Sequence, residues 1–293
     1  MQDNFFRVKN SLNKDVKNDI DIDINKIEFV DLHNHILPYV DDGSDSENTS
    51  IDMLKIAYDD GVRHIIATPH YIPGELENIS GIVKSRLLSI IEKCKNIDLK
   101  VNIYPGNEIF ISPDIPDLIE NGSICTLNNS SYVLIELPLM SIPPYTQEVL
   151  YKLQLKGYKP IIAHPERNSE VITDPNVLYD FVKRGILVQS NSNSFLGLYG
   201  KNVKETAFKL LNHSMVHFVS SDAHGIKRRS PKLYSAFKLV AESLDPETGL
   251  DLFSKNGMAV INNLDIKTSE PEEIKNKKSF ILSTLMKLVN IHL

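Results

Sequence analysis

Histidine, aspartate and glutamate residues recur along the chain in short groups whose side chains could bind metal ions. In the first group, His33 and His35 are separated by one residue, and the acids Asp41 and Asp42 follow closely. Side chains two positions apart on an extended segment point to the same side, so both imidazoles can serve one site. The same spacing recurs in Asp222-Ala223-His224. Three single residues between these two groups, His70, Glu108 and His164, are also candidates. The candidate ligands are therefore His33, His35, Asp41 or Asp42, His70, Glu108, His164, Asp222 and His224.

This mixture of imidazoles and carboxylates indicates a cluster of divalent ions. Such ligands suit zinc, manganese and iron, and the lack of a nearby thiolate argues against a purely structural zinc site. The candidates outnumber what one ion needs, so we expect two or three ions with a carboxylate, Glu108, as the bridge. A cluster of this kind can activate a water and hold the oxygens of a transferring phosphoryl group. A lone histidine is more often structural, but five of the nine histidines belong to this set.

Two arginines follow these groups at short distances. Arg167 comes directly after His164-Pro165-Glu166, and Arg229 lies five residues after His224. A planar guanidinium matches two phosphate oxygens and stays charged at any working pH. For Arg229, which stands beside Lys227 and Arg228, a solvated surface arginine is the alternative.

Composition excludes several other classes of function. A cysteine phosphatase needs an arginine six positions after its nucleophile, but Lys100 follows Cys94 and Ser131 follows Cys125 at that distance. The formal charge of −6 disfavours a nucleic-acid-binding protein. The chain shows neither a signal peptide nor an apolar run long enough to cross a membrane, so we expect a cytoplasmic enzyme.

The elements that must position these residues alternate between short apolar strands and helices. Buried-looking runs of this kind, separated by helical segments, are typical of a parallel sheet, most simply a closed or nearly closed barrel. Gly61, Gly157 and Gly185 each follow a predicted helix, where a left-handed cap is expected. The predicted strands are Glu28–Leu32, Arg63–Ala67, Val101–Tyr104, Tyr132–Glu136, Pro160–Ala163, Ile186–Gln189 and His217–Ser220. The predicted helices are Thr49–Asp60, Gly81–Lys95, Tyr145–Lys156, Asn176–Arg184, Asn202–Asn212 and Lys232–Ser243.

The candidate ligands fall at the carboxyl ends of these strands, which meet on one face of a parallel barrel. The sequence therefore predicts a single pocket at that face. Outside the barrel, residues 1–25 form a polar N-terminal extension, and residues 264–293 form a C-terminal segment. Within that segment, Phe280–Leu293 carries an apolar helical stripe, suited either to packing on the barrel or to association with a partner or a second copy.

Six blocks of the sequence, in order, carry a resemblance to the polymerase and histidinol phosphatase (PHP) superfamily. Between about residues 26 and 263, the chain is similar to the bacterial capsule and exopolysaccharide-type protein tyrosine phosphatases of that superfamily. The Leu37-Pro38 extension with Asp41-Asp42-Gly43 and the His164-Pro165-Glu166-Arg167 block separate this branch from the histidinol phosphatases. The remaining blocks are Asp31-Leu32-His33-Asn34-His35, Ala67-Thr68-Pro69-His70, Gly106-Asn107-Glu108 and Ser221-Asp222-Ala223-His224.

The resemblance implies an α/β fold, namely a distorted (β/α)7 TIM-like barrel. It also implies a trinuclear metal site that usually contains Mn²⁺, although Fe, Zn or Mg would also fit the ligands. It implies dephosphorylation of a bacterial tyrosine kinase, and it favours Asp42 over Asp41, which spacing alone leaves open. By position, the implied phosphate-binding residues are Arg167 and Arg229. The implied metal ligands are His33, His35, Asp42, His70, Glu108, His164, Asp222 and His224.

The hypothesis is therefore a metal-bridged hydroxide that attacks phosphotyrosine in a protein. A phenolate leaving group with a pKa of about 10 is easier to expel than an alkoxide, so a strong general acid is less necessary. Two alternatives remain, a small-molecule phosphatase of the histidinol phosphate type and a non-catalytic module that docks on the kinase.

Overall fold

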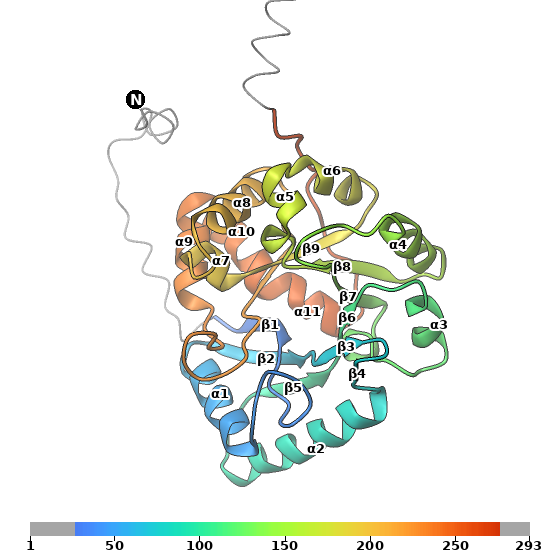
Figure 1. Ribbon diagram of the computed structural model, residues 1–293. Coiled ribbons are helices and arrows are strands. Elements are labelled where there is room, and N and C mark those ends of the chain that lie inside the picture. The colour runs from blue at the N-terminus through green and yellow to red at the C-terminus, as the bar shows by residue number, and fades with distance from the viewer. Residues whose placement is uncertain (1–26, 276–293) are drawn as a thin grey trace, which may run out of the picture.

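The computed structural model describes residues 27–275, in which a barrel of strands is surrounded by helices (Figure 1). The barrel has seven strand positions, which follow one another in sequence order. Two of these positions are each occupied by an interrupted strand, one formed by β2 and β3 and the other by β5 and β6. The strands are β1 (Phe29–Asn34), β2 (Val62–Ala67), β3 (His70–Ile72), β4 (Leu76–Glu77), β5 (Asn102–Pro105), β6 (Glu108–Phe110), β7 (Tyr132–Glu136), β8 (Lys159–Ala163), β9 (Leu187–Asn191) and β10 (Phe218–Ser220).

The register shows that the interrupted strands are continuous and that the barrel closes. Ala67 pairs with Pro105, and His70, three residues on, pairs with Glu108, three residues after Pro105. Closure between β10 and β1 follows from backbone hydrogen bonds, in which Asp222 N donates to His33 O at 2.9 Å and His35 N donates to Ala223 O at 3.0 Å. The expected barrel is confirmed, and all of its described pairings are parallel except the β3–β4 hairpin.

Helices cover the outside of the strands (Figure 1). Their predicted caps are present, since Gly61, Gly157 and Gly185 have φ values of 91°, 83° and 85°. Within residues 27–275, none of the helices combines the length and the apolar character that a membrane span requires. The helices are α1 (Glu47–Asp59), α2 (Ser80–Asn96), α3 (Ile115–Glu120), α4 (Thr146–Leu155), α5 (Ser169–Thr173), α6 (Asn176–Lys183), α7 (Ser192–Leu196), α8 (Lys201–Asn212), α9 (Tyr234–Ser243), α10 (Pro246–Leu250) and α11 (Asn256–Ile261), with the tighter or wider turns η2 (Leu127–Asn129), η3 (Pro165–Arg167) and η4 (Asp251–Lys255).

The barrel interior is apolar at its amino end. One or two side chains from most strands, among them Leu32, Leu134 and Phe218, form a buried cluster that also contains Val260 of α11. Helix α11 approaches β1 so closely that a Cβ on Gly257 would lie 2.6 Å from Val30 Cγ1. Because this end is filled and covered by α11, polar side chains collect at the opposite, carboxyl end of the strands.

The structure differs from the sequence-based expectation mainly in short elements. Strands β3 and β6 were not predicted, because three residues are too few to establish a period and each follows a break at Pro69 or Asn107. Helices α3, α5, α7, α10 and α11, of five or six residues each, were missed for the same reason. The predicted extension 1–25 and the helical stripe Phe280–Leu293 lie outside the described residues, so the domain boundaries remain predictions.

His217 gives the fold a pH dependence that is separate from the candidate site. Its ring is buried, and Nδ1 accepts a hydrogen bond from Val188 N at 3.1 Å. Burial lowers the pKa of His217 to about 4, below the value of about 6.5 expected in the unfolded chain. The unfolded state therefore binds a proton at a higher pH than the folded state, so His217 destabilises the fold as the pH falls from 6.5 towards 4.

We expect His217→Gln to remove this dependence. Relative to the variant, the wild type should lose about 1 kcal/mol of unfolding free energy between pH 7.5 and pH 5.5. Urea unfolding of both proteins at the two pH values measures the difference. Equal losses in the wild type and the variant would show that His217 does not carry the effect.

Candidate metal centre

The structure brings all eight predicted ligands together at the carboxyl end of the barrel. His33 and His35 come from β1 and its end, His70 and Glu108 are the first residues of the neighbouring strands β3 and β6, and His164 directly follows β8. Asp222 and His224 follow β10, and Asp42 lies in the loop between β1 and α1.

The Glu108 carboxylate lies at the centre of this group. Its Oε2 atom is 3.2 Å from His33 Nε2, 3.2 Å from His35 Nε2 and 3.0 Å from His70 Nδ1, while Oε1 is 2.9 Å from His164 Nε2. Glu108 is fully buried, and none of the three short contacts of Oε2 has the geometry of a hydrogen bond. Three ring nitrogens thus face one buried oxygen without forming hydrogen bonds to it. This arrangement is expected of side chains that bind the same metal ions.

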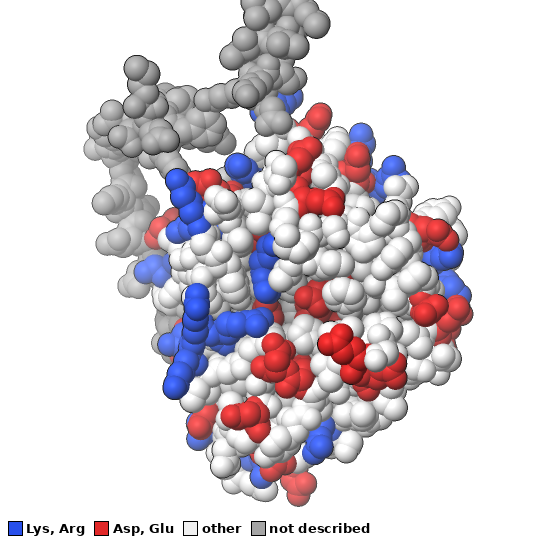
Figure 2. All heavy atoms as spheres, in the orientation of Figure 1, with Lys and Arg blue, Asp and Glu red and all other residues white. Residues whose placement is uncertain are grey.

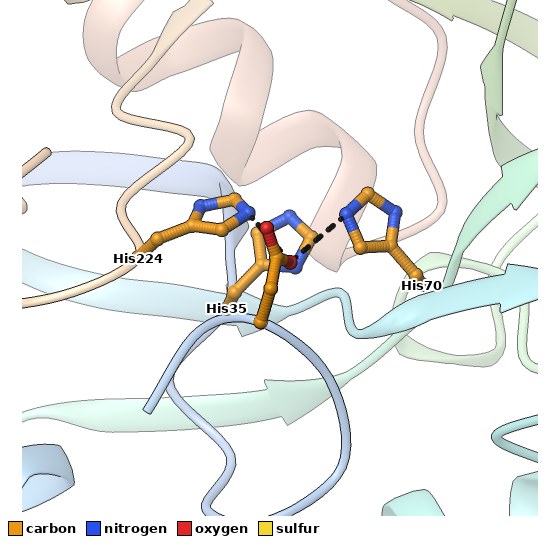
Figure 3. Close-up of side chains that lie close together, drawn as sticks. His35, His70 and His224 are labelled. Carbon is orange, nitrogen blue, oxygen red and sulfur yellow. Dashed lines mark ion pairs between the residues drawn. The ribbon is translucent and has the colours of Figure 1, made fainter. Parts of the chain in front are cut away.

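Asp42 completes a second group on the outer side of the cluster. Its Oδ1 atom lies 3.3 Å from His224 Nε2 and 3.5 Å from His70 Nε2. Figure 3 shows His35, His70 and His224 pointing towards one another from different parts of the barrel, with a carboxylate between them. Together with Asp42, they each offer one ligand atom, all within 4.8 Å of one another.

A third group contains a residue that the sequence reasoning missed. Glu136, the last residue of β7, lies 3.7 Å from His70 Nδ1 through Oε2 and 3.9 Å from His164 Nε2 through Oε1. It forms a possible ligand set with His70 and Glu108. The other candidates were chosen because they lie at the carboxyl ends of predicted strands. Glu136 is the last residue of a predicted strand, so the same criterion could have found it in the sequence.

Asp222 joins the cluster to the two arginines. Its Oδ2 atom accepts hydrogen bonds from Arg167 Nη1 at 2.9 Å and from Asn191 Nδ2 at 2.6 Å. Its Oδ1 atom accepts one from Arg229 Nη2 at 2.8 Å and lies 3.6 Å from His33 Nε2. The side chain of Arg229 is thus paired at the site rather than free in solvent.

A second layer of residues orients the imidazoles. Asp41 Oδ2 is 2.8 Å from His35 Nδ1 and accepts a hydrogen bond from His70 N, whereas Gln189 Oε1 is 2.9 Å from His33 Nδ1. With each Nδ1 held from behind, the opposite ring nitrogen points into the cluster. Gly43 permits this packing, because a Cβ there would lie 2.3 Å from His35 O.

Asp31, the first residue of the Asp31-Leu32-His33-Asn34-His35 block, joins two sides of the site. Its buried carboxylate accepts hydrogen bonds from Ser221 N at 2.8 Å, from Ser221 Oγ at 2.5 Å and from Asn34 Nδ2 at 2.8 Å. Asp31 therefore fixes the segment that carries His33 and His35 against the segment that carries Asp222. The backbone is strained nearby, since His164 and Asp222 have left-handed φ values of 32° and 50°. Such strain is concentrated at functional sites.

The electric field of the cluster favours bound positive charge. Burial opposes protonation of the imidazoles, but Asp41 raises the pKa of His35 to about 9, and Asp42 with Glu108 raises the pKa of His70 to about 11. Burial likewise opposes charge on Glu108, yet His33 and His164 hold its pKa well below the usual range. The donors around Glu108 are imidazole nitrogens and carboxylate oxygens, and neither cysteine belongs to the groups. This donor set fits manganese, iron or zinc.

Comparison with known proteins shows the family. The family model for capsular polysaccharide synthesis, CpsB/CapC, matches residues 29–262. The chain belongs to the CpsB/CapC family. Tyrosine-protein phosphatase YwqE of Bacillus subtilis is 34% identical over 252 residues, which cover 86% of this chain and 99% of YwqE. CapC of Staphylococcus aureus is 38% identical over 256 residues, with coverage of 86% and 99%.

The fold of this CpsB/CapC family member also matches a solved structure. A crystal structure from work on YwqE of Bacillus subtilis and CpsB of Streptococcus pneumoniae, described as metal-dependent tyrosine phosphatases, superposes with a TM-score of 0.81. Sequence identity is 34%, and the match covers 84% of this chain and all of the other. The resemblance to the capsule-type branch of the PHP superfamily is confirmed.

Proposed function

We propose that this CpsB/CapC family member is a metal-dependent tyrosine phosphatase that binds manganese through the eight predicted residues. The convergence of four imidazoles on the buried Glu108 carboxylate, beside two arginines, carries the proposal. The reaction class rests on the family, since relatives similar over almost their whole length are metal-dependent tyrosine phosphatases. Its role belongs to capsular polysaccharide synthesis.

More than one ion fits the ligand groups. His35, His70 and Glu108 each belong to two of the three groups, so these three residues would help to hold more than one ion. Divalent ions supply an activated water and neutralise charge that develops on the phosphoryl oxygens. The chain's own contribution is to hold the ligands in place, through Asp41, Gln189 and Asp31, before the substrate arrives.

The arginines supply the anion-binding part of the site. Arg167 and Arg229 approach Asp222 from η3 and from the loop after β10, and both are partly exposed to the mouth. Arg229 holds Asp222 through Nη2 alone and its side chain is 27% exposed, so the rest of its guanidinium group could meet a phosphoryl oxygen. The Arg167 guanidinium lies 4.8 Å from the centre of the Tyr199 ring, which restrains its position.

The cysteines do not offer a competing nucleophile. Both are buried, and burial raises the pKa of the Cys125 thiol to about 11 and that of Cys94 above its usual value. Because the thiolate is the reactive form, these side chains are poorly suited to attack a phosphate ester at neutral pH. A phosphocysteine intermediate is therefore not part of the proposal.

The natural substrate, in this proposal, is a phosphotyrosine segment of a bacterial tyrosine kinase that controls capsule or exopolysaccharide synthesis. A protein substrate suits a site at an open barrel mouth whose ligand Asp42 has a side chain that is 67% exposed. The phenolate leaving group lowers the need for a strong general acid.

Metal analysis together with substrate comparison tests the proposal. The purified protein should contain two or three ions for each chain, lose phosphatase activity on chelation and recover it best with Mn²⁺. The recovered enzyme should hydrolyse a phosphotyrosine peptide far faster than the matched phosphoserine peptide or histidinol phosphate. Preference for histidinol phosphate would indicate the small-molecule phosphatase, and metal binding without turnover would indicate a docking module.

A further inference from the structure

The loop after β10 joins the candidate site to the outer surface. His224 and Arg229, at its two ends, point into the site. Arg229 O accepts hydrogen bonds from His224 N at 2.9 Å and from Gly225 N at 3.2 Å, so the loop is closed at its base. Its tip is formed by Ile226, Lys227 and Arg228, all of which are exposed. The tip is therefore held beside the mouth of the barrel.

The two cations of the tip have no acidic partner within residues 27–275. Neither Lys227 nor Arg228 forms an ion pair there, and Arg228 Nη2 donates a hydrogen bond to Leu198 O at 3.4 Å. Leu198 precedes Tyr199, whose ring lies against Arg167. Arg228 thus adjoins the corner of the site that holds the phosphate-binding arginines.

Charge at the mouth is divided between two sides. In Figure 2, Lys and Arg side chains gather at one edge of a central hollow, in the area where Figure 1 shows the orange loop before α9. Acidic side chains lie across the hollow, on the side of α2 and the β3–β4 hairpin. That hairpin carries the exposed acids Glu75 and Glu77. A substrate segment crossing the mouth therefore meets a group of lysine and arginine side chains at one edge and acidic side chains across from it.

We propose that Lys227 and Arg228 form a subsite for a negatively charged group that flanks the phosphotyrosine. This inference rests on the proposed tyrosine phosphatase function and specifies its substrate. The negative group is either a carboxylate side chain or a second phosphate on a nearby tyrosine, since both are anions that a lysine and an arginine bind. A single exposed charge contributes little to binding, but two together contribute more. At low salt, kcat/KM should therefore be about tenfold higher for a peptide with a negatively charged residue beside the phosphotyrosine than for one with a neutral residue there.

Peptides that differ only beside the phosphotyrosine test the subsite. The peptides carry alanine, glutamate, lysine or a second phosphotyrosine as the flanking residues, and p-nitrophenyl phosphate serves as a substrate without a flank. The wild type should prefer the glutamate and doubly phosphorylated peptides over the alanine peptide, and added salt should reduce this preference. Comparing the two preferred peptides distinguishes the carboxylate from the phosphate.

The double variant Lys227→Ala/Arg228→Ala should reduce the ratio of glutamate-peptide to alanine-peptide kcat/KM towards one. Lys227→Glu/Arg228→Glu should shift the preference towards the lysine peptide. The matched control is Lys183→Ala/Arg184→Ala, an adjacent exposed pair that precedes β9 and so lies at the opposite end of the barrel. It should keep the wild-type ratio, because it removes the same charge far from the mouth.

Two outcomes would overturn the inference alone: a wild type without preference at low salt, or a preference that survives in both loop variants. A metal-loaded wild type that hydrolyses p-nitrophenyl phosphate but none of the phosphotyrosine peptides would overturn the proposed function and the subsite with it.

Discussion

Glu108→Gln should lower kcat/KM for a phosphotyrosine peptide by about a thousandfold, which corresponds to about 4 kcal/mol. The substitution keeps the shape of the side chain but removes the negative charge that faces His33, His35 and His70 at 3.0 to 3.2 Å. An amide nitrogen at Oε2 would also place hydrogen atoms among ring nitrogens that we expect to bind ions. Metal content should fall together with activity.

Glu136→Gln is the matched control for this prediction. It changes a carboxylate of the same type at the same mouth, but Glu136 reaches its nearest imidazoles only at 3.7 and 3.9 Å and is partly exposed. Its effect should be at least tenfold smaller. Elemental analysis, kcat/KM and circular dichroism of both variants provide the comparison. A Glu108→Gln protein with full metal content and wild-type turnover would contradict the central position of this carboxylate.

The clustering of the proposed ligands could be predicted because the barrel brings their positions together. Parallel strands that follow one another around a barrel bring their carboxyl ends to one face, so a histidine near the end of β1 and another directly after β8 meet although more than a hundred residues separate them. His33 and His164 approach the same carboxylate for this reason. The amino end of the same strands is filled by apolar side chains and covered by α11.

The choice between Asp41 and Asp42 could not be predicted from spacing. Both residues lie in one loop, and the outcome depends on how Gly43 packs under His35. In the structure, Asp41 turns behind the ring of His35, while Asp42 faces His70 and His224. This placement supports the resemblance-based choice of Asp42, although its role as a ligand stays a proposal.

The residues that orient the imidazoles could not be predicted from the sequence, for a different reason. Gln189 and Asn191 alternate along β9, and nothing in their residue types separates them from other polar residues at a strand end. Their roles depend on side-chain contacts, with His33 for Gln189 and with Asp222 for Asn191. The left-handed backbone of His164 and Asp222 was not predicted either, because histidine and aspartate adopt positive φ more often than most residues but still in only a small fraction of positions.

Arg167→Lys should lower kcat/KM for the same peptide by about a hundredfold, and Arg167→Ala by at least as much. Arg167 uses one nitrogen to hold Asp222, and its planar guanidinium can still present others to a phosphoryl oxygen. A lysine retains the charge but not the fork, so it cannot satisfy the carboxylate and the phosphate in the same geometry. It also cannot stack in the same way on Tyr199.

The inhibition constant for inorganic phosphate separates anion binding from a purely structural role. If Arg167 binds the phosphoryl group, that constant should rise in both variants while metal content stays at the wild-type value. Arg184→Lys, at the far end of the barrel, controls for the substitution itself. If Arg167 only braces Asp222, metal content should fall and phosphate inhibition should not weaken, because the disturbed carboxylate lies 3.6 Å from His33. That result would remove Arg167 from the substrate site and leave Arg229, whose side chain is 27% exposed, as the arginine that binds phosphate.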